Sequence, residues 1–303
     1  MIIIRVMGGL GNQLQQYALY RKMETLGREA GLDLSWFDKK IQASMQAPRE
    51  LELNRLEGLS MNVVPPEEVR ALLGRQYGDR ESVLEKVRRK IRPSLAHVFE
   101  ETDMYHPEIF RWQDKYLVGY WACEAYYADI LDRLREEICF PGSADSRNRE
   151  TAEEMEDCES VSVHVRRGDY LDAANAEMFG NICTQDYYDC AVSYMKERYP
   201  KAVFYVFSDD SAYVREKYRG PEYRIVDWNR KENSFYDMML MSHCRHNICA
   251  NSTFSFWGAR LNGHAGKIMI RPSIHKNTQV CVPDQMKQMW PGWTLISPEG
   301  VCI

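Results

Sequence analysis

Two arginines stand at the end of a short apolar strand within residues 161–170, Val-Ser-Val-His-Val-Arg-Arg-Gly-Asp-Tyr. Successive side chains of a strand point to opposite faces, so the three valines share one face and His164 and Arg166 share the other. Guanidinium groups suit planar anions with several oxygens, such as a diphosphate. The stretch therefore predicts that Arg166 and Arg167 form an anion site. A surface turn in which an arginine pairs with the neighbouring Asp169 fits the same residues.

Other apolar strands also end in small polar residues. The strand 202–207 is followed by Ser-Asp-Asp at 208–210, and the strand 247–250 leads to Ser252 and Thr253 at the start of a helix. Free N–H groups at a helix N-terminus favour phosphate. The two adjacent aspartates could ligate a metal, but their spacing favours helix capping. Together these strand ends predict a nucleoside diphosphate held by arginine and helix N–H groups, without a metal.

The composition is that of an ordinary globular protein, with 45% hydrophobic and 27% charged residues among 303. A net charge of −5 argues against non-specific nucleic-acid binding. No apolar run approaches the length of a membrane span, and nine scattered cysteines suggest neither a disulfide framework nor a zinc site. We therefore expect a cytoplasmic protein.

The chain begins with an apolar strand at 1–6, a glycine-rich turn and a helix, which is the opening of a Rossmann-like half. Asn12 is expected to cap this helix, and 32–37 is expected to form the second strand. The glycines of the turn would let the backbone approach a phosphate or a sugar. The third glycine of the dinucleotide motif is absent, so a nicotinamide enzyme with Asp33 on the ribose is only a rival hypothesis.

The rest of the chain alternates strands with helices, which predicts parallel α/β sheets. A proline-glycine break and an acidic run precede the strand at 161–165. We therefore expect an N-terminal domain over 1–155 and a C-terminal domain over 156–303. The polar stretch from 170 to 183 has no clear period and is expected to be a long functional loop. The aromatic residues Tyr120 and Trp121 could stack on a sugar.

The motifs at 8–13 (Gly-Gly-Leu-Gly-Asn-Gln), 164–169, 208–210 and 251–257 (Asn-Ser-Thr-Phe-Ser-Phe-Trp), in this order, resemble the bacterial α-1,2-fucosyltransferase family, glycosyltransferase family 11. The resemblance implies an α/β, GT-B-like fold with two Rossmann-like domains facing across a cleft. It implies a GDP-fucose donor bound by the C-terminal domain, an acceptor on the N-terminal side, no metal or other cofactor, and inversion at the anomeric carbon. Phe256 is commonly Trp in the family, which puts the shape of a side pocket in doubt.

By the same resemblance, Arg166 holds the β-phosphate while His164 and Asp237 lie near the guanine. Asn12 lies near the donor from the first domain. The predicted catalytic residues are Arg166 and Asp169, with Asp172 and Glu177 as further candidates for the general base. The predicted donor-binding residues are Gly9, Asn12, His164, Arg166, Arg167, Ser208, Asp209, Asp237, Ser252, Thr253 and Phe254, and the predicted acceptor-binding residues are Tyr120, Trp121 and Glu177.

Several alternatives stay open at this point. Transfer to another position (α-1,6 or O-linked), a nucleotide-binding oxidoreductase and a non-catalytic binding module all fit parts of the pattern. His164 could be a core histidine and Asp237 a surface carboxylate. The expected partners are a nucleotide sugar and a β-galactoside glycan, with no nucleic acid and with peripheral contact to the inner membrane. The basic cluster at 86–92 is either a solvated helix face or a contact with acidic lipid.

Overall fold

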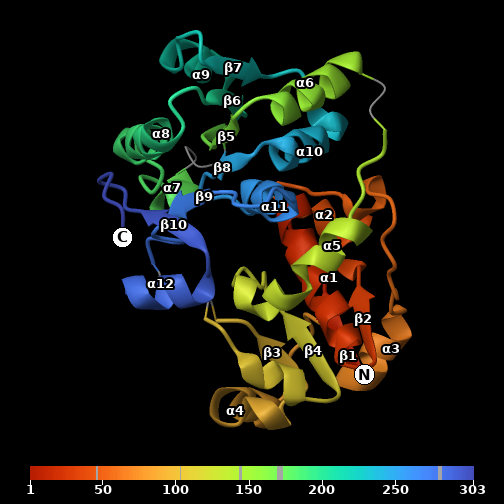
Figure 1. The fold of residues 1–303 in the computed structure, drawn as a ribbon. Helices are drawn as coiled ribbons and strands as arrows, with labels where there is room; N and C mark the ends of the chain where they lie inside the picture. Colours follow the sequence, from red (N-terminus) through yellow and green to blue (C-terminus); the bar gives the residue numbers. More distant parts are fainter. Residues whose placement is uncertain (46, 103, 143–144, 169–172, 279–281) are drawn as a thin grey trace. The chain divides into compact units, whose positions relative to one another are not determined.

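The computed structural model describes residues 1–303 except 46, 103, 143–144, 169–172 and 279–281. The chain divides into two compact units, Met1–Cys139 and Phe140–Ile303 (Figure 1). The division lies sixteen residues before the expected boundary of 155/156, because helix α6 (Ser146–Asp157) belongs to the second unit. Met155 of this helix is buried in a hydrophobic cluster of the second unit. The acidic run therefore marks the outer surface of a helix and not a linker.

In the first unit, the described strands form a parallel sheet in the order β2-β1-β4-β3. The central strand β1 begins with three isoleucines that are all buried. Such a continuous buried apolar run is typical of a strand covered on both faces. The glycine-rich turn after β1 leads directly into α1. The strands of this unit are β1 (Ile2–Arg5), β2 (Ala30–Asp33), β3 (Val98–Glu100) and β4 (Lys115–Val118), and its α-helices are α1 (Leu10–Thr25), α2 (Lys39–Gln42), α3 (Pro66–Leu73), α4 (Val83–Ile91) and α5 (Leu131–Glu137).

In the second unit, the described strands form a parallel sheet in the order β10-β9-β8-β5-β6-β7. The chain builds outward from β5 to β7 on one side and then crosses to β8, on the other side of β5. The strands are β5 (Ser160–Val165), β6 (Val203–Ser208), β7 (Tyr223–Val226), β8 (His246–Ile248), β9 (Met269–Pro272) and β10 (Trp293–Ile296). Besides α6, the helices are α7 (Ala173–Phe179), α8 (Gln185–Arg198), α9 (Ser211–Lys217), α10 (Phe235–His243), α11 (Thr253–Leu261) and α12 (Pro283–Met289).

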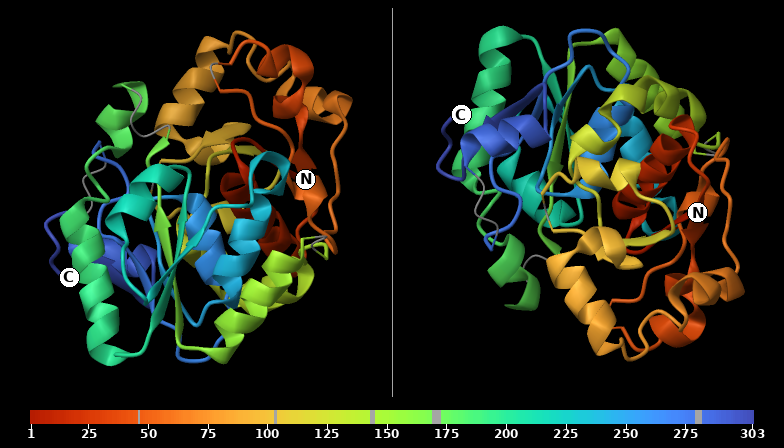
Figure 2. Two further views of the ribbon diagram at one scale, coloured as in Figure 1. Left: turned by 90° about the horizontal axis from the view of Figure 1, so that it is seen from above. Right: turned by 90° about the horizontal axis from the view of Figure 1, so that it is seen from below.

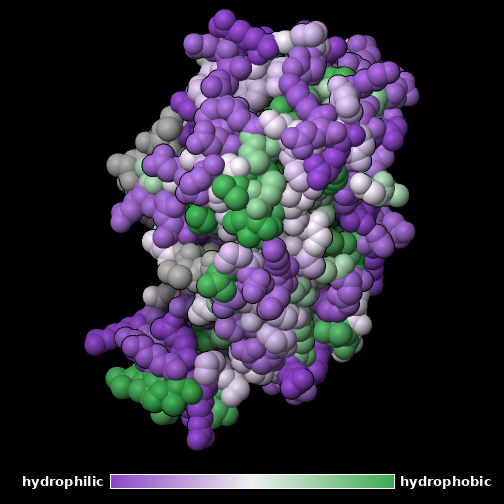
Figure 3. Space-filling view, turned by 60° about the vertical axis from the view of Figure 1, so that its left-hand side comes forward, coloured by the Kyte–Doolittle hydropathy of each residue, from purple (hydrophilic) through white to green (hydrophobic). Residues whose placement is uncertain are grey.

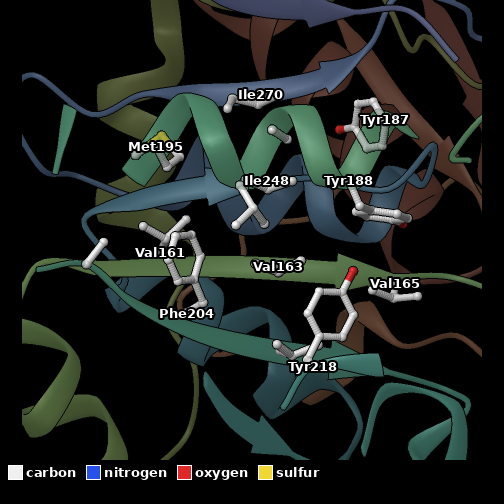
Figure 4. Packing of buried hydrophobic residues seen from close by; sticks show 14 of the residues in the cluster. Val161, Val163, Val165, Tyr187, Tyr188, Met195, Phe204, Tyr218, Ile248 and Ile270 are labelled. Carbon is white, nitrogen blue, oxygen red and sulfur yellow. The ribbon is translucent and has the colours of Figure 1, made fainter. Parts of the chain in front are cut away.

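The core of the second unit is built on the valine face predicted for β5. Helix α8 covers that face, and α10 and α11 cover the opposite one (Figure 2). Val161, Val163 and Val165 pack with Tyr187 and Tyr188 of α8, as Figure 4 shows. Burying each such apolar side chain contributes about 1.5–3 kcal/mol. This packing holds β5 rigidly, and with it the residues at its carboxyl end.

The sequence-based expectation was wrong at two places in the fold. The stretch 170–183 is not a continuous loop, because α7 forms within it. The second strand ends at Asp33, and a 3-10 turn follows at Ser35–Phe37 instead of the expected extension of the strand. The Asp33 carboxylate accepts a hydrogen bond from the Ser35 N–H at 2.9 Å, which turns the chain there.

The predicted α/β class with two Rossmann-like units is confirmed, since each unit holds a parallel sheet with helices, whereas the GT-B-like arrangement across a cleft stays a prediction. In each sheet, the strand that follows the central strand in sequence (β2 after β1, β6 after β5) lies on one side of it, and later strands of the same unit lie on its other side. In the part of the chain that the structure describes, no helix combines the length and the apolar character needed to cross a membrane.

Candidate functional site

The carboxyl ends of β5 and β8 in the second unit form a topological switch point. The strand order reverses between these two neighbours, and ligands of parallel α/β sheets bind at such points. His164 of β5 and Phe254 in the first turn of α11 lie with ring centroids 6.0 Å apart. The arginine turn after β5 and the helix N-terminus after β8 are thus brought to one edge, as the sequence predicted.

Arg166 is held at this edge by Asp209, which follows β6. Arg166 Nη1 lies 2.9 Å from Asp209 Oδ2, and both side chains are about three-quarters buried. The other carboxylate oxygen accepts a hydrogen bond from the Arg167 backbone N–H at 3.0 Å. A Cβ on Gly168 would lie only 2.7 Å from Asp209 Oδ2, so glycine is what allows the carboxylate to approach the turn. Asp209 therefore clamps the turn and orients the Arg166 guanidinium.

Arg167 points to the neighbouring helix α9. Its Nε donates to Asp210 Oδ2 at 3.1 Å, and its guanidinium carbon lies 3.8 Å from the centre of the Tyr213 ring. Asp210 also accepts from the Tyr213 N–H at 3.0 Å, so it caps α9 as predicted. The Arg167 guanidinium thus already contacts the Asp210 carboxylate and the Tyr213 ring. These contacts make Arg167 a weaker candidate for donor binding than Arg166.

The N-terminus of α11 is open. Ser252 is the N-cap residue, but its side chain makes no capping hydrogen bond. Among the described residues we find no acceptor for the backbone N–H groups of Thr253 and Phe254. These N–H groups carry the positive end of the helix dipole and can bind an anion.

Ser208, another predicted donor-binding residue, is used inside the fold. Its hydroxyl donates to the Val165 carbonyl at 2.7 Å and accepts from the Asp210 N–H at 3.0 Å. This hydroxyl ties the ends of β5 and β6 together. Its structural role is to hold the Arg166 turn next to Asp209.

His164 is buried and uncharged at neutral pH. Burial and, to a smaller extent, the nearby positive charge of Arg166 together lower the pKa of His164 to about 3. Its Nδ1 is buried and has no hydrogen-bond partner among the described residues. An orphaned ring nitrogen of this kind costs free energy unless a ligand or water satisfies it. His164 is therefore more than a satisfied core histidine.

Asp237, on α10, belongs to a polar network beyond the end of β7. Asn229 donates from Nδ2 to Asp237 Oδ1 at 2.9 Å and also exchanges hydrogen bonds with Asn148 at 2.9 and 3.0 Å. Burial raises the pKa of Asp237 to about 7. Such a carboxyl is not an ordinary surface aspartate, because burial makes its ionised form unfavourable. A ligand whose N–H groups donate to it would stabilise the ionised form.

The glycine turn of the first unit is arranged differently. Gly9 is the N-cap of α1, so Asn12 lies inside the helix and the expectation that it caps α1 was wrong. The Leu10 N–H donates to the Glu52 carboxylate at 2.9 Å. The Asn12 side chain folds back over Gly8, where an added Cβ would lie 2.6 Å from Asn12 Nδ2. The positive end of α1 is therefore already paired with an anion, and the assignment of Gly9 and Asn12 to donor binding stays a prediction.

The rival nicotinamide hypothesis required a free carboxylate at Asp33. Asp33 is 2% exposed, and its carboxylate accepts from the Ser35 N–H, from the Ser35 hydroxyl at 3.0 Å and from the Tyr116 hydroxyl at 2.5 Å. It lines a small pocket together with Arg5 and Tyr77. Since its hydrogen-bonding capacity is used by the protein, Asp33 is poorly suited to hold a ribose.

The predicted acceptor-binding and catalytic residues have different outcomes. Trp121 has no exposed surface and packs against Phe99 and Tyr126, so its ring belongs to the core and the expectation of sugar stacking was wrong for it. Tyr120 is 44% exposed and Glu177 is exposed on α7, so both stay predictions. Asp169 and Asp172 lie outside the described residues.

Sequence reasoning missed two groups near the same edge of the sheet. Arg271, at the end of β9, is completely buried with its guanidinium 3.6 Å from the Trp290 ring and 4.3 Å from the Phe256 ring. Phe256 is therefore a core residue and lines no side pocket. Asn229, the partner of Asp237, was also missed. Arg271 lies in the last two residues of β9 and Asn229 lies three residues after β7, so a search for polar residues near the carboxyl ends of strands could have found them.

No group of three or more His, Cys, Asp or Glu side chains that could hold a metal occurs among the described residues. The aspartates that the sequence offered as ligands have other partners, because Asp209 pairs with Arg166 and Asp210 pairs with Arg167. The donor set at this edge thus suits an anion better than a divalent cation.

Comparison with known sequences gives one relative over nearly the whole chain and others over about a third of it. The sequence model of glycosyl transferase family 11 matches residues 104–297. An alpha-1,2-colitosyltransferase of Escherichia coli is 30% identical over 90% of this chain and 91% of its own length. The O-antigen biosynthesis glycosyltransferase WbnK of Escherichia coli is 40% identical over 39% of each chain. Galactoside alpha-(1,2)-fucosyltransferase 2 of Bos taurus is 33% identical over 34% of this chain and 30% of its own.

Among solved structures, POFUT1 in complex with GDP has a TM-score of 0.43 and 15% identity, covering 88% of this chain and 97% of its own. The Escherichia coli ADP-heptose LPS heptosyltransferase II has a TM-score of 0.39 and 12% identity, covering 97% and 89%. Likenesses this distant support no statement about ligand or activity.

Proposed function

The chain belongs to glycosyl transferase family 11, and we propose that it transfers L-fucose from GDP-fucose to the 2-hydroxyl of a terminal β-galactose. The proposal is an α-1,2 linkage formed with inversion at the anomeric carbon. The observation that carries it is that Arg166 and the uncapped N-terminus of α11 follow neighbouring strands, β5 and β8, at one switch point. These groups suit a departing diphosphate.

In the proposed reaction, the galactose 2-oxygen attacks the fucose anomeric carbon from the face opposite GDP. The bond between that carbon and the β-phosphate oxygen breaks, and its electron pair leaves with GDP. Arg166 and the N–H groups of Thr253 and Phe254 are already oriented by the fold, so they stabilise the developing charge without reorganising. The proton of the 2-hydroxyl goes to a carboxylate, for which we propose Asp169, with Asp172 and Glu177 as alternatives.

Guanine recognition is proposed for Asp237 and His164. An ionised Asp237 can accept from the two N–H donors on the Watson–Crick edge of guanine, and those donors would lower its raised pKa. A neutral His164 presents one donor and one acceptor, and its orphaned Nδ1 gains a partner if the nucleotide reaches it. We propose that no metal takes part, because Asp209 and Asp210 are committed to arginines.

A second donor sugar is favoured by one relative, whose name is alpha-1,2-colitosyltransferase. Colitose is fucose without its 3-hydroxyl. A pocket that donates or accepts a hydrogen bond at that hydroxyl would reject colitose, whereas an apolar pocket would accept it. GDP-colitose is therefore the alternative donor, with the same diphosphate site.

The test is incubation with GDP-fucose or GDP-colitose and a panel of β-galactosides, with the product linkage read by NMR. We expect an α-1,2-linked product from GDP-fucose that requires Arg166. A product from GDP-colitose alone would change the donor and keep the site. Only α-1,6-linked or peptide-linked fucose would overturn the linkage. Binding of GDP without transfer to any β-galactoside would favour a non-catalytic module.

A further inference from the structure

Helix α4 presents its apolar side chains to solvent. Ser82 caps the helix by accepting from the Glu85 N–H at 3.2 Å, and none of the nine helical residues is buried. The apolar residues stand at helical spacing, so they form one stripe along the helix. Their exposed fractions are 78% for Val83, 61% for Leu84, 46% for Val87 and 73% for Ile91, with Leu95 beyond the helix end at 55%.

The polar edge of the same helix faces the protein. Arg89 pairs with Glu81 at 3.1 Å and also with Glu100, at the end of β3. The Glu85 carboxylate accepts from the His97 N–H at 2.6 Å. Glu85 and Arg89 lie four residues apart and therefore on one face, opposite the apolar stripe. This orientation is the inverse of an ordinary surface helix, which buries its apolar face.

Basic side chains flank the exposed stripe. Lys86, Arg88 and Lys90 are exposed on α4, and Arg92 follows the helix. The acidic neighbours Glu81 and Glu85 are turned inward, with side-chain exposures of 9% and 14%. This outward-facing positive charge occurs in a chain whose net charge is −5. Figure 3, coloured by hydropathy, shows exposed apolar residues in green beside hydrophilic ones in purple at the lower left, at the level where Figure 1 draws α4.

We propose that α4 docks the protein on a membrane surface that carries anionic lipid headgroups. An apolar stripe flanked by Lys and Arg is the pattern of a helix that lies in the membrane interface. The apolar side chains enter the boundary with the acyl chains, and the basic ones bind phosphate groups. A second copy of this chain is a poorer occupant, because a two-fold contact would place the two basic flanks against each other. The proposal is independent of the reaction that the second unit catalyses.

The test is co-sedimentation of the full chain with phosphatidylglycerol vesicles and with phosphatidylcholine vesicles. The variant Leu84→Asp/Ile91→Asp places two charges in the stripe. The control Val282→Asp/Val301→Asp makes the same change in charge at residues that are 53% and 58% exposed in the second unit. We expect wild type and control to bind anionic vesicles, and the α4 variant to bind at least about tenfold more weakly. Thermal unfolding of each variant checks that the fold is kept.

Binding to neutral vesicles should be weaker, and high salt should weaken the anionic binding. Wild type that stays in the supernatant with both lipids would overturn the proposal, as would equal loss of binding in the control. Sedimentation velocity supplies the third outcome. A wild-type dimer that the α4 variant dissociates would show that the stripe covers a second copy and not a membrane.

Discussion

Each unit places a helix N-terminus after one of the two strands at its switch point, α1 after β1 and α11 after β8, but only that of α11 lacks a carboxylate partner among the described residues. In the first unit, the turn after β1 leads to α1, whose Leu10 N–H is bonded to the Glu52 carboxylate. In the second unit, α11 has no side-chain cap, and Arg166 stands on the neighbouring strand end. A carboxylate that already occupies a helix N-terminus competes with phosphate, whereas an uncapped N-terminus beside a guanidinium attracts it.

The difference teaches that a glycine-rich turn and a helix are not sufficient evidence of an anion site. The first turn has the more recognisable sequence, yet its helix dipole is satisfied by the protein itself. The turn before α11 has no glycine, and the proposed anion site there depends on groups that follow three strands, β5, β6 and β8. The comparison predicts that nucleotide affinity resides in the second unit, and four substitutions test it.

The largest effect is expected for Arg166→Ala. Loss of the guanidinium should lower kcat/KM for GDP-fucose by about a hundredfold to a thousandfold, which is the scale of one preorganised oxyanion donor. Arg166→Lys should recover only part of this, because an ammonium cannot bind two oxygens in a fork. GDP release on addition of a β-galactoside is the measurement. Arg198→Ala, on the outer part of α8, is the matched control, and near-normal turnover of Arg166→Ala would disprove the assignment.

The next effect concerns Asp237 and has a defined pH dependence. Asp237→Asn should weaken GDP binding about tenfold to a hundredfold, as expected for a lost charged hydrogen bond. In wild type, GDP affinity should fall as the pH drops below about 7, where the carboxyl becomes protonated. Calorimetric titration across this range should show a flat profile for the variant. An equally steep profile in both proteins would remove Asp237 from the site.

Stability gives an independent readout for the same residue. The pKa of Asp237 is raised in the folded state, so folding favours the protonated form. Stability should therefore decline as the pH rises from the ordinary value of 3.8 toward about 7. Above that range, Asp237→Asn should be more stable than wild type, by roughly 2–4 kcal/mol. A variant that is both less active and more stable is the expected signature of a buried functional charge.

A smaller effect is expected for Asp209→Asn, which removes the charge that orients Arg166. KM for GDP-fucose should rise about tenfold while kcat changes less, because the arginine remains but is no longer held in place. The neighbouring Asp210→Asn loses the cap of α9 and should leave KM within about twofold. Equal effects of the two substitutions on KM would show that Asp209 has no special part in positioning Arg166.

The smallest effect on binding is expected for Glu52→Gln, in the first unit. It should lower the free energy of unfolding by about 1 kcal/mol, because α1 loses the anion at its N-terminus. GDP affinity should not change. If the variant gains affinity for GDP or for a dinucleotide, the first turn can bind an anion once the Glu52 charge is removed. The two units would then differ only in that Glu52 blocks the first site.

Much of the fold could be predicted from local patterns. The alternation of valines in β5 and the polar ends of the apolar strands gave the parallel sheets and the edge where Arg166 and α11 meet. What local patterns could not supply were the partners. Glu52 is 42 residues from Leu10, and Asp209 is 43 residues from Arg166, so these contacts depend on how the whole unit folds.

The errors have the same origin. Asn12 is an ordinary capping residue, but Gly9 already ends the turn in the required conformation, so the helix begins earlier. Trp121 follows a strand as a sugar-stacking ring would, but Phe99 and Tyr126 enclose it completely. The domain boundary at 155/156 was predicted from a proline-glycine break and an acidic run, whereas that run lies largely in α6, which packs into the second unit through Met155.

Hydrogen–deuterium exchange of the full chain with and without GDP tests the central claim most directly. The account predicts that GDP slows exchange at the backbone amides of Thr253 and Phe254 and in the turn at 166–168, with little change at 8–12. Arg166→Ala should reduce this protection. Protection confined to the turn at 8–12, with none at the start of α11, would contradict the account.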